Sequence, residues 1–451
     1  MHTKIYSLIS SVIVLALAGA TTVHAASAED TAKLKSTFTP LGAEKAGNKD
    51  GTIPAWDGGL KAVTAGFVNG GRRPDPFGGE QKLYSITAKN VGEYSDKLTE
   101  GTKALFKRYP DSFRVDVYPT HRTSSAPQWV YDNTFKNATT AKLTKNLVVQ
   151  DAFAGIPFPV PANGAEVMWN SILRWRGEAF RQQSQAFLGT SDGKLILTAD
   201  NLIDQQMPYY FHDTPKEYKG EYLMNRLVNT GPPIRAGESI VGRVNVDDEK
   251  SRAWVYITGQ RRVRGLPNAC CDTPTPAAAG VMSFDEINVF SGRMDRFDWK
   301  LVGKREMLVP YNDNDIMVPK KTTDVLGPHH LNPDHVRWEL HRVWVVEANL
   351  APGARHSAQR SVYYVDEDSW IALLGDRFDS KGQLWKTLFQ LPIAAPDLPG
   401  TISGPYGFMD LLSGTWFVAL LWNEKSEQLK FVPHYPDTTF TSDAMAGEGV
   451  R

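Results

Sequence analysis

The sequence predicts a mainly β protein of the α+β class, a mostly antiparallel sheet with helices packed against one face. Two observations lead to this class. Segments that alternate apolar and polar residues are joined by short polar turns, which is typical of antiparallel hairpins and not of crossover units. One segment after residue 163 places apolar side chains at helical spacing, and this gives an amphipathic helix with one apolar face.

The expected strands begin at residues 113–117, where apolar and polar side chains alternate, and residues 128–133 and 147–150 look similar. From residue 185 onward the chain is expected to consist mostly of paired strands. The hairpins are 185–188 with 194–198, 239–246 with 252–258, and 361–365 with 370–374, and the long strands are 338–348, 383–391 and 415–422.

Three helices are expected. A polar helix spans about 89–109 and ends before Pro110. The amphipathic helix begins at Asn163, which can cap it while Glu166 reaches back. A short third helix near 283–290 opens with a second capping box. The apolar face of the amphipathic helix carries Ala165, Met168, Trp169, Ile172 and Trp175.

Residues 1–25 have the pattern of a secretory signal peptide. A short positive region is followed by an apolar run over residues 5–18, and small residues precede a cleavage site after Ala25. The apolar run is too short to span a bilayer. We therefore expect an exported chain, 26–451, forming a single domain with an ordered N-terminal extension over about 26–80.

The charge balance argues against nucleic-acid binding. Lysine plus arginine and aspartate plus glutamate number 50 each, whereas nucleic-acid binders carry a basic surplus. The only two cysteines, Cys270 and Cys271, are neighbours, so they cannot close a long loop. They are either incidental thiols or a strained local bridge.

Several expected strands are rich in aromatic residues. Large aromatic side chains are ordinary core material wherever sheets pack. The alternative is that one sheet face is only partly covered and, closed by the amphipathic helix, lines an apolar cavity that could hold a lipid tail. The candidate cavity residues are Trp254, Tyr256, Trp338, Trp344, Tyr364, Trp370, Trp385 and Trp416 from the strands, with Met168, Trp169 and Ile172 from the helix.

Three arginines, Arg261, Arg262 and Arg264, end the strand that contains Trp254. Guanidinium groups suit carboxylate or phosphate recognition, so these residues are the candidates for holding an anionic head group. Structural ion pairs with acidic residues of neighbouring strands are the alternative.

Other motifs do not support catalysis or metal binding. Residues 189–193 match G-x-S-x-G, but strand signals on both sides make a hairpin turn the natural interpretation of Ser191. Asp313 and Asp315 lack the rest of a calcium loop, so a solvated turn is expected. The histidines lack the spacing of a zinc helix, and a polar loop leading into the 338–348 strand is the expected alternative to a metal site: His329, His330, His335 and His341. We expect no catalytic residue, metal or cofactor.

Several phrases in order resemble one exported bacterial family, the domain of unknown function numbered 1329. They are PLGAEKAGN at 40–48, IPAW at 53–56, GIPFP at 155–159, GQRRVR at 259–264, DWKLVG at 298–303 and ELHRVWVVEA at 339–348. The family is likened to the lipoprotein carrier LolA. This resemblance implies a large curved antiparallel sheet or half barrel, whose apolar concave face is lidded by helices.

The resemblance also implies a periplasmic protein of Gram-negative bacteria, and association with the outer membrane is compatible with it. The expected function is binding or shuttling of a lipophilic ligand, namely a lipid, lipoprotein acyl chains or a hydrophobic small molecule. Partners implied are an inner-membrane export pump of the resistance-nodulation-division type and an outer-membrane protein. The alternatives are a non-enzymatic adaptor bridging envelope proteins, and a hydrolase that would need Ser191 beside a histidine.

Overall fold

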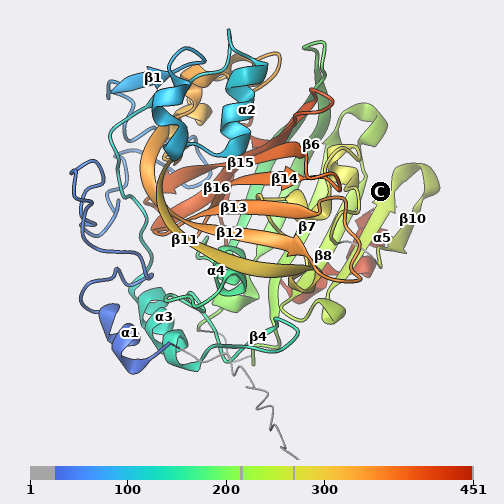
Figure 1. Cartoon of the computed structure of the whole chain (residues 1–451). Coiled ribbons are helices and arrows are strands. Elements are labelled where there is room, and N and C mark those ends of the chain that lie inside the picture. The colour runs from blue at the N-terminus through green and yellow to red at the C-terminus, as the bar shows by residue number, and fades with distance from the viewer. Residues whose placement is uncertain (1–25, 214–216, 268–269, 449–451) are drawn as a thin grey trace, which may run out of the picture.

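The computed structural model describes residues 26–213, 217–267 and 270–448, and the expected signal peptide at 1–25 lies outside them (Figure 1). Most of the described chain belongs to one sheet of 16 strands. A small two-stranded sheet is separate from it. The strands of the large sheet are β1 (Tyr84–Ile86), β2 (Val115–Val117), β5 (Ala179–Gly189), β6 (Leu195–Gln206), β7 (Glu221–Gly231), β8 (Ser239–Asn245), β9 (Arg252–Ile257), β10 (Arg262–Gly265), β11 (Phe297–Pro310), β12 (Trp338–Leu350), β13 (Arg360–Asp366), β14 (Ala372–Phe378), β15 (Leu384–Ala395), β16 (Gly400–Asp410), β17 (Trp416–Leu421) and β18 (Leu429–Phe431), and those of the small sheet are β3 (Lys142–Leu143) and β4 (Val149–Gln150).

The strand order of the large sheet is β1-β2-β12-β13-β14-β15-β16-β17-β5-β6-β7-β8-β9-β10, with β11 beside β12 and β18 beside β5. All pairs are antiparallel except one short parallel contact between β12 and β2, where Trp338 lies opposite Val117. The two ends of the order do not pair with each other in the described residues, so the sheet is open. In Figure 1, β12–β14 run across the view and β6–β8 run close to vertical, which shows how strongly the sheet bends. The predicted class, a mainly β protein with a large curved antiparallel sheet, is confirmed.

The helices are α1 (Ala28–Lys33), α2 (Glu100–Arg108), α3 (Gln128–Thr140), α4 (Gly164–Ile172) and α5 (Ser442–Glu448). The predicted amphipathic helix is α4, and the Asn163 side chain caps it by accepting from the Glu166 N–H at 3.0 Å. This helix packs on β11, β12 and β13. The other face of the sheet also carries helices, because α2 packs on β14 and β15 there and α5 packs on β8, β9 and β10.

Three local predictions are wrong. Residues 128–133 form the start of helix α3 and not a strand, because Val130, Tyr131 and Thr134 fall on one buried helical face. The expected helix at 89–109 is a 3₁₀ segment, Val91–Lys97, followed by α2, whose new start is capped by Thr99. At 283–290 only the 3₁₀ turn Phe284–Glu286 forms, although its capping box is present as predicted.

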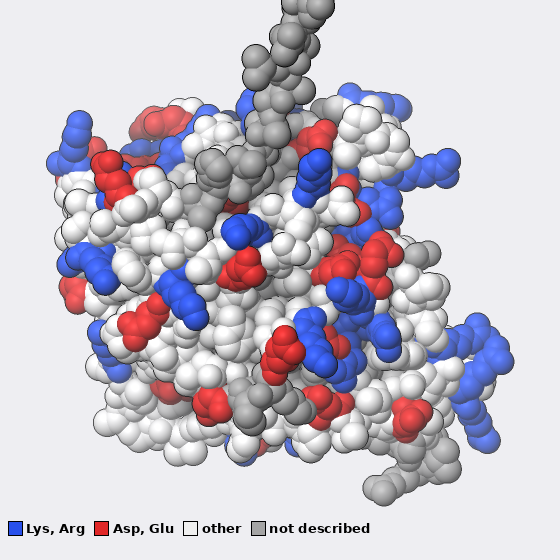
Figure 2. Space-filling view, turned by 90° about the horizontal axis from the view of Figure 1, so that it is seen from below, with Lys and Arg blue, Asp and Glu red and all other residues white. Residues whose placement is uncertain are grey.

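Residues 26–83 contain α1 and a long series of turns, and they lie against the sheet core. The indole N–H of Trp370 donates to the Leu41 carbonyl at 2.8 Å, and both residues are buried. Gly42 next to it has φ +104°, and a Cβ there would come within 2.1 Å of the Pro159 carbonyl oxygen, so this close approach of two backbones requires glycine. On the face of the molecule seen in Figure 2, acidic and basic side chains are interspersed.

Candidate ligand-binding cavity

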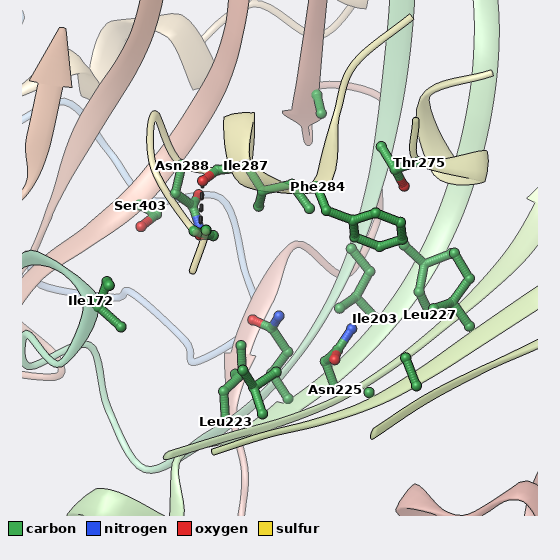
Figure 3. A pocket seen from close by; sticks show the side chains of 18 of the residues that line it. Ile172, Ile203, Leu223, Asn225, Leu227, Thr275, Phe284, Ile287, Asn288 and Ser403 are labelled. Atoms are coloured by element: carbon green, nitrogen blue, oxygen red, sulfur yellow. Dashed lines mark hydrogen bonds between the residues drawn. The ribbon is translucent and has the colours of Figure 1, made fainter. Parts of the chain in front are cut away.

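A cavity of about 310 Å³ lies between one end of the sheet and the segment that follows β10. Its floor and walls come from β5–β9, β16 and β17, together with the end of α4. Its cover is formed by residues 270–296, here called the cover segment, which contains the 3₁₀ turns Pro276–Ala278, Phe284–Glu286 and Met294–Arg296. Figure 3 shows Phe284 and Ile287 of the cover segment across the cavity from Leu223 and Ile203 of the strands. This volume is at the lower end of the range found for small-molecule sites.

Alternation along the strands separates the cavity face from the opposite face. On β7, Leu223 and Leu227 line the cavity. Between them Met224 points the other way, into a second buried cluster that includes Phe440 and Met445 of the C-terminal segment. Leu223 and Leu227 are only half-buried, because they face the cavity and not a packed core. The C-terminal segment therefore fills one side of this part of the sheet, and the other side is left open to a ligand.

Buried ion pairs attach the cover segment to the sheet. Asp285 accepts from Arg377 of β14 at 2.9 Å and from His356 at 2.8 Å, and all three side chains are buried. Glu286 accepts from Lys386 of β15 at 2.9 Å. Burial by itself would raise the pKa of Asp285, but Arg377 and His356 outweigh it and lower this pKa to about 2. The carboxylate is thus charged and paired at neutral pH.

The cavity lining is strongly positive. It includes six arginines, one aspartate and no glutamate or lysine. Arg243 pairs with Glu221 at 2.6 Å and Arg293 pairs with Asp295 at 2.5 Å, so two of the six are neutralised by acids behind the wall. Burial raises the pKa of Asp248, the aspartate of the lining, to about 7, although Arg293 lies 4.0 Å away and opposes the shift.

Several polar atoms of the cavity wall have no hydrogen-bond partner among the described residues. They include the Gln182 and Asn201 side-chain oxygens and the Arg174 Nε, all of them buried. A buried polar group without a partner costs free energy, so these atoms are available to hydrogen-bond a ligand or water in the cavity.

Of the eleven residues predicted to line a cavity, Ile172 does so. The two other residues predicted from the helix are buried on α4, where the Trp169 indole donates to the Leu147 carbonyl at 2.7 Å. Trp254 and Tyr256 of β9 belong to the cluster on the opposite face of the sheet. Trp338 lines a separate pocket of about 50 Å³ beneath α2.

The remaining predicted aromatic residues lie in the body of the protein. Trp344 and Trp370 stack with ring centroids 6.3 Å apart. The Trp416 indole donates to the Pro328 carbonyl at 3.1 Å, and the Trp385 indole to Asp410 at 3.0 Å. Tyr364 lies near Asp376, with the two oxygens 3.5 Å apart. These side chains fill the core and anchor loops, and none of them lines the cavity.

The arginines predicted to hold a head group do not line the cavity. Arg261, Arg262 and Arg264 are exposed at the edge of the sheet, on and just before β10. No ion pair joins any of them to a described residue within 4.0 Å. The arginines that do line the cavity stand elsewhere in the sequence, and nothing in their local pattern marked them.

The other motifs are placed as follows. Ser191 is exposed in the β5–β6 hairpin turn, where Thr190 N–H donates to the Lys194 carbonyl at 2.9 Å. The expected solvated turn at 312–315 is wrong, because Asp313 is fully buried and accepts from the Arg337 N–H at 2.8 Å. Burial raises the pKa of Asp313 well above its usual value.

Among the described residues, His341, Asp366 and Asp368 hold possible metal-ligand atoms within 4.8 Å of one another. Two of these three side chains already pair with other side chains of the protein. His341 pairs with Glu339 at 2.9 Å, and Asp368 pairs with Arg122 at 2.7 Å. The cluster is therefore a buried hydrogen-bonded network in which arginine supplies the positive charge.

The chain belongs to the family described as "Protein of unknown function (DUF1329)", whose model matches residues 85–446. It is 38% identical over 461 residues to the uncharacterized protein PA3922 of Pseudomonas aeruginosa, with 100% of each chain covered.

Two solved structures are similar at lower identity. One is a DUF1329 family protein from Desulfovibrio piger, 15% identical, covering 60% of this chain and 92% of that one with a TM-score of 0.41. The other is a putative outer membrane lipoprotein-sorting protein domain from Vibrio parahaemolyticus, 12% identical, covering 63% and 98% with a TM-score of 0.44. None of the helices within residues 26–213, 217–267 and 270–448 has both the length and the apolar character needed to cross a membrane.

Proposed function

We propose that the protein is a periplasmic binding protein that holds a lipophilic ligand in the cavity beneath the cover segment and shuttles it. The observation that carries this proposal is a cavity of about 310 Å³, lined in part by aliphatic side chains, that protein side chains leave unfilled. Burying apolar surface there would supply about 25 cal/mol per Å², so part of an acyl chain is enough for useful affinity.

The supporting geometry is that the two faces of β7–β9 are covered differently. The face opposite the cavity is closed by Phe440 and Met445. The cavity face is covered by a segment that has little regular structure and is attached through a few buried ion pairs. A ligand would therefore lie between the strands and this segment.

The proposal includes export by the N-terminal signal and, as partners, an inner-membrane pump and an outer-membrane protein that deliver and accept the ligand. It describes a binding protein and not an enzyme. Ser191 supports this choice, because it lies in an exposed hairpin turn and not at a strand-to-helix elbow.

A cavity-filling substitution tests the proposal. Leu227→Trp places a larger side chain in open space, so the fold should be retained while a neutral hydrophobic dye loses at least about tenfold in affinity. Leu412→Trp is the matched control, because Leu412 is 46% exposed and does not line the cavity. A wild-type protein that binds no hydrophobic dye, and that carries no lipid when analysed by native mass spectrometry, would overturn the proposal.

A further inference from the structure

Two arginines project into the cavity from the connection between α4 and β5. Arg174 and Arg176 both line the cavity, and Trp175 between them points to the other side. The Trp175 ring packs against Trp129 and Tyr210 at centroid distances of 5.1 Å, and its indole donates to the Pro399 carbonyl at 3.0 Å. The anchored tryptophan thus holds both guanidinium groups on the cavity side.

Arg174 differs from the other buried arginines of the described residues. Arg73, Arg122, Arg337, Arg342 and Arg377 each pair with a carboxylate. Arg174 has only neutral partners, the Ser171 carbonyl and the Ser403 hydroxyl, each at 2.5 Å. Its Nε is buried without a partner.

Arg176 is also unpaired, since it forms no hydrogen bond or ion pair with any described residue. Its charge lies close enough to Arg174 to disfavour the charged form of that residue. Burial lowers the pKa of Arg174 well below its usual value, and Arg176 lowers it further. Burial likewise lowers the pKa of Arg176. Arg174 is buried and Arg176 is half-buried. Two neighbouring cations that are withdrawn from water and have no anion beside them are costly, and an anion bound by both would reduce this cost.

We propose that Arg174 and Arg176 bind the anionic head group of an amphiphile whose apolar chain occupies the rest of the cavity. The inference rests on the function proposed above and names the ligand class as anionic lipids bearing a carboxylate or a phosphate. Guanidinium groups bind both anions through paired hydrogen bonds.

The layout of the cavity fits this ligand. Ile172 is two residues before Arg174 in the sequence, and Ser403 accepts a hydrogen bond from Arg174. Both residues lie at one end of the cavity in Figure 3. Leu227 and Phe284 lie toward the other end. A head group at the arginines therefore leaves its chain directed along the aliphatic wall, beneath the cover segment.

The test compares chain-matched probes on the full-length mature protein. Dodecanoate and dodecyl phosphate supply the two anions, and dodecanol is the neutral control. We expect both anionic probes, or one of them, to displace a neutral hydrophobic dye at least about tenfold better than dodecanol, because charge-assisted hydrogen bonds are stronger than neutral ones. The stronger of the two identifies the head group as carboxylate or phosphate.

Variants then assign the effect to the arginines. Arg176→Gln and Arg174→Met should each remove most of the anion preference and leave dodecanol binding within about twofold, while Arg264→Gln outside the cavity changes neither. Arg174→Met should also raise the melting temperature of the ligand-free protein, because it removes an unpaired buried charge.

The outcomes separate the two proposals. Equal binding of dodecanol and the anionic probes overturns the head-group site and leaves the hydrophobic cavity intact. Anion preference that survives in Arg176→Gln, with a lower melting temperature for Arg174→Met, also overturns the site. Failure of every probe, dodecanol included, overturns the proposed function itself.

Discussion

Asp285 of the cover segment and Arg377 of β14 form a buried ion pair, with 2.9 Å between the carboxylate oxygen and Nη2. Neither side chain is measurably open to solvent, with exposures of 1% and 0%. The pair joins the roof of the cavity to the centre of the sheet, so the stability of the fold and the shape of the cavity depend on the same contact.

Removing one partner of this pair should destabilise the protein. Arg377→Met leaves Asp285 buried with His356 and the Ser283 hydroxyl as its side-chain partners, and breaking a buried pair in this way typically costs about 3–5 kcal/mol. Urea denaturation measures the loss in the free energy of unfolding. The control is Arg360→Met, because Arg360 is 35% exposed and its pair with Glu347 should contribute under about 1 kcal/mol. Equal effects of the two substitutions would contradict the structural role of Asp285.

Asp248 should make stability depend on pH. Its pKa is raised from the ordinary 3.8 to about 7, so the folded protein holds one more proton than the unfolded chain between these values. Stability should therefore fall as the pH rises from about 4 to 7 and level off above. With the side chain 28% exposed, we expect an effect on the order of 2 kcal/mol.

The measurement for Asp248 is the difference between wild type and Asp248→Asn in melting temperature across pH 4 to 8, because other groups titrate in both. The variant should gain most relative to wild type at pH 8. A constant difference over the whole range would show that Asp248 does not titrate with a raised pKa.

Trp370 should matter for stability and not for ligand binding. Trp370→Phe removes the hydrogen bond to Leu41 and part of a fully buried ring, which should cost about 2 kcal/mol. Dye affinity, measured where the variant is fully folded, should be unchanged. A large loss of dye affinity without loss of stability would place Trp370 in the binding site.

Cys270 lines the cavity, and its sulfur lies 2.6 Å from that of Cys271. The hydrogen bond between the two thiols lowers the pKa of Cys270, whereas the same hydrogen bond, together with burial, raises the pKa of Cys271. A thiol-reactive maleimide should therefore modify Cys270 first, since the thiolate is the reactive form. Dodecanoate bound in the cavity should slow this reaction, as followed by tandem mass spectrometry on the wild-type peptide that carries both cysteines. Labelling at the same rate with and without a saturating ligand would show that the ligand binds elsewhere.

The sequence was sufficient to predict the sheet because its hairpins are local. Alternation and polar turns mark β8–β9 and β13–β14 without reference to the rest of the chain. The strands β7, β11 and β16 were missed. Their pattern is interrupted by glycine, proline or charged residues at half-buried positions, and only the pairing with neighbours makes them strands.

The candidate site was harder to predict, because large aromatic residues can either line a cavity or fill the core, and the sequence does not distinguish the two. Trp370 and Trp416 were chosen as candidates because their side chains are large and apolar. The same property makes them effective core residues, and both are fully buried. The cavity is instead lined by ordinary residues such as Ile203 and Leu223, whose place beside it depends on the pairing of strands distant in sequence. The sequence also does not show which arginine will lack a carboxylate partner, because this depends on contacts between distant segments. Arg174, for example, donates to the neutral hydroxyl of Ser403.

Photo-crosslinking locates the bound ligand most directly. A fatty acid with a diazirine near the end of its chain is bound to the mature protein and irradiated, and the modified peptides are mapped by mass spectrometry. We expect adducts on β7 and β8 and on the cover segment, lost when Leu227→Trp fills the cavity. Adducts confined to the opposite face around Tyr256 and Phe440, or none at all, would contradict the account.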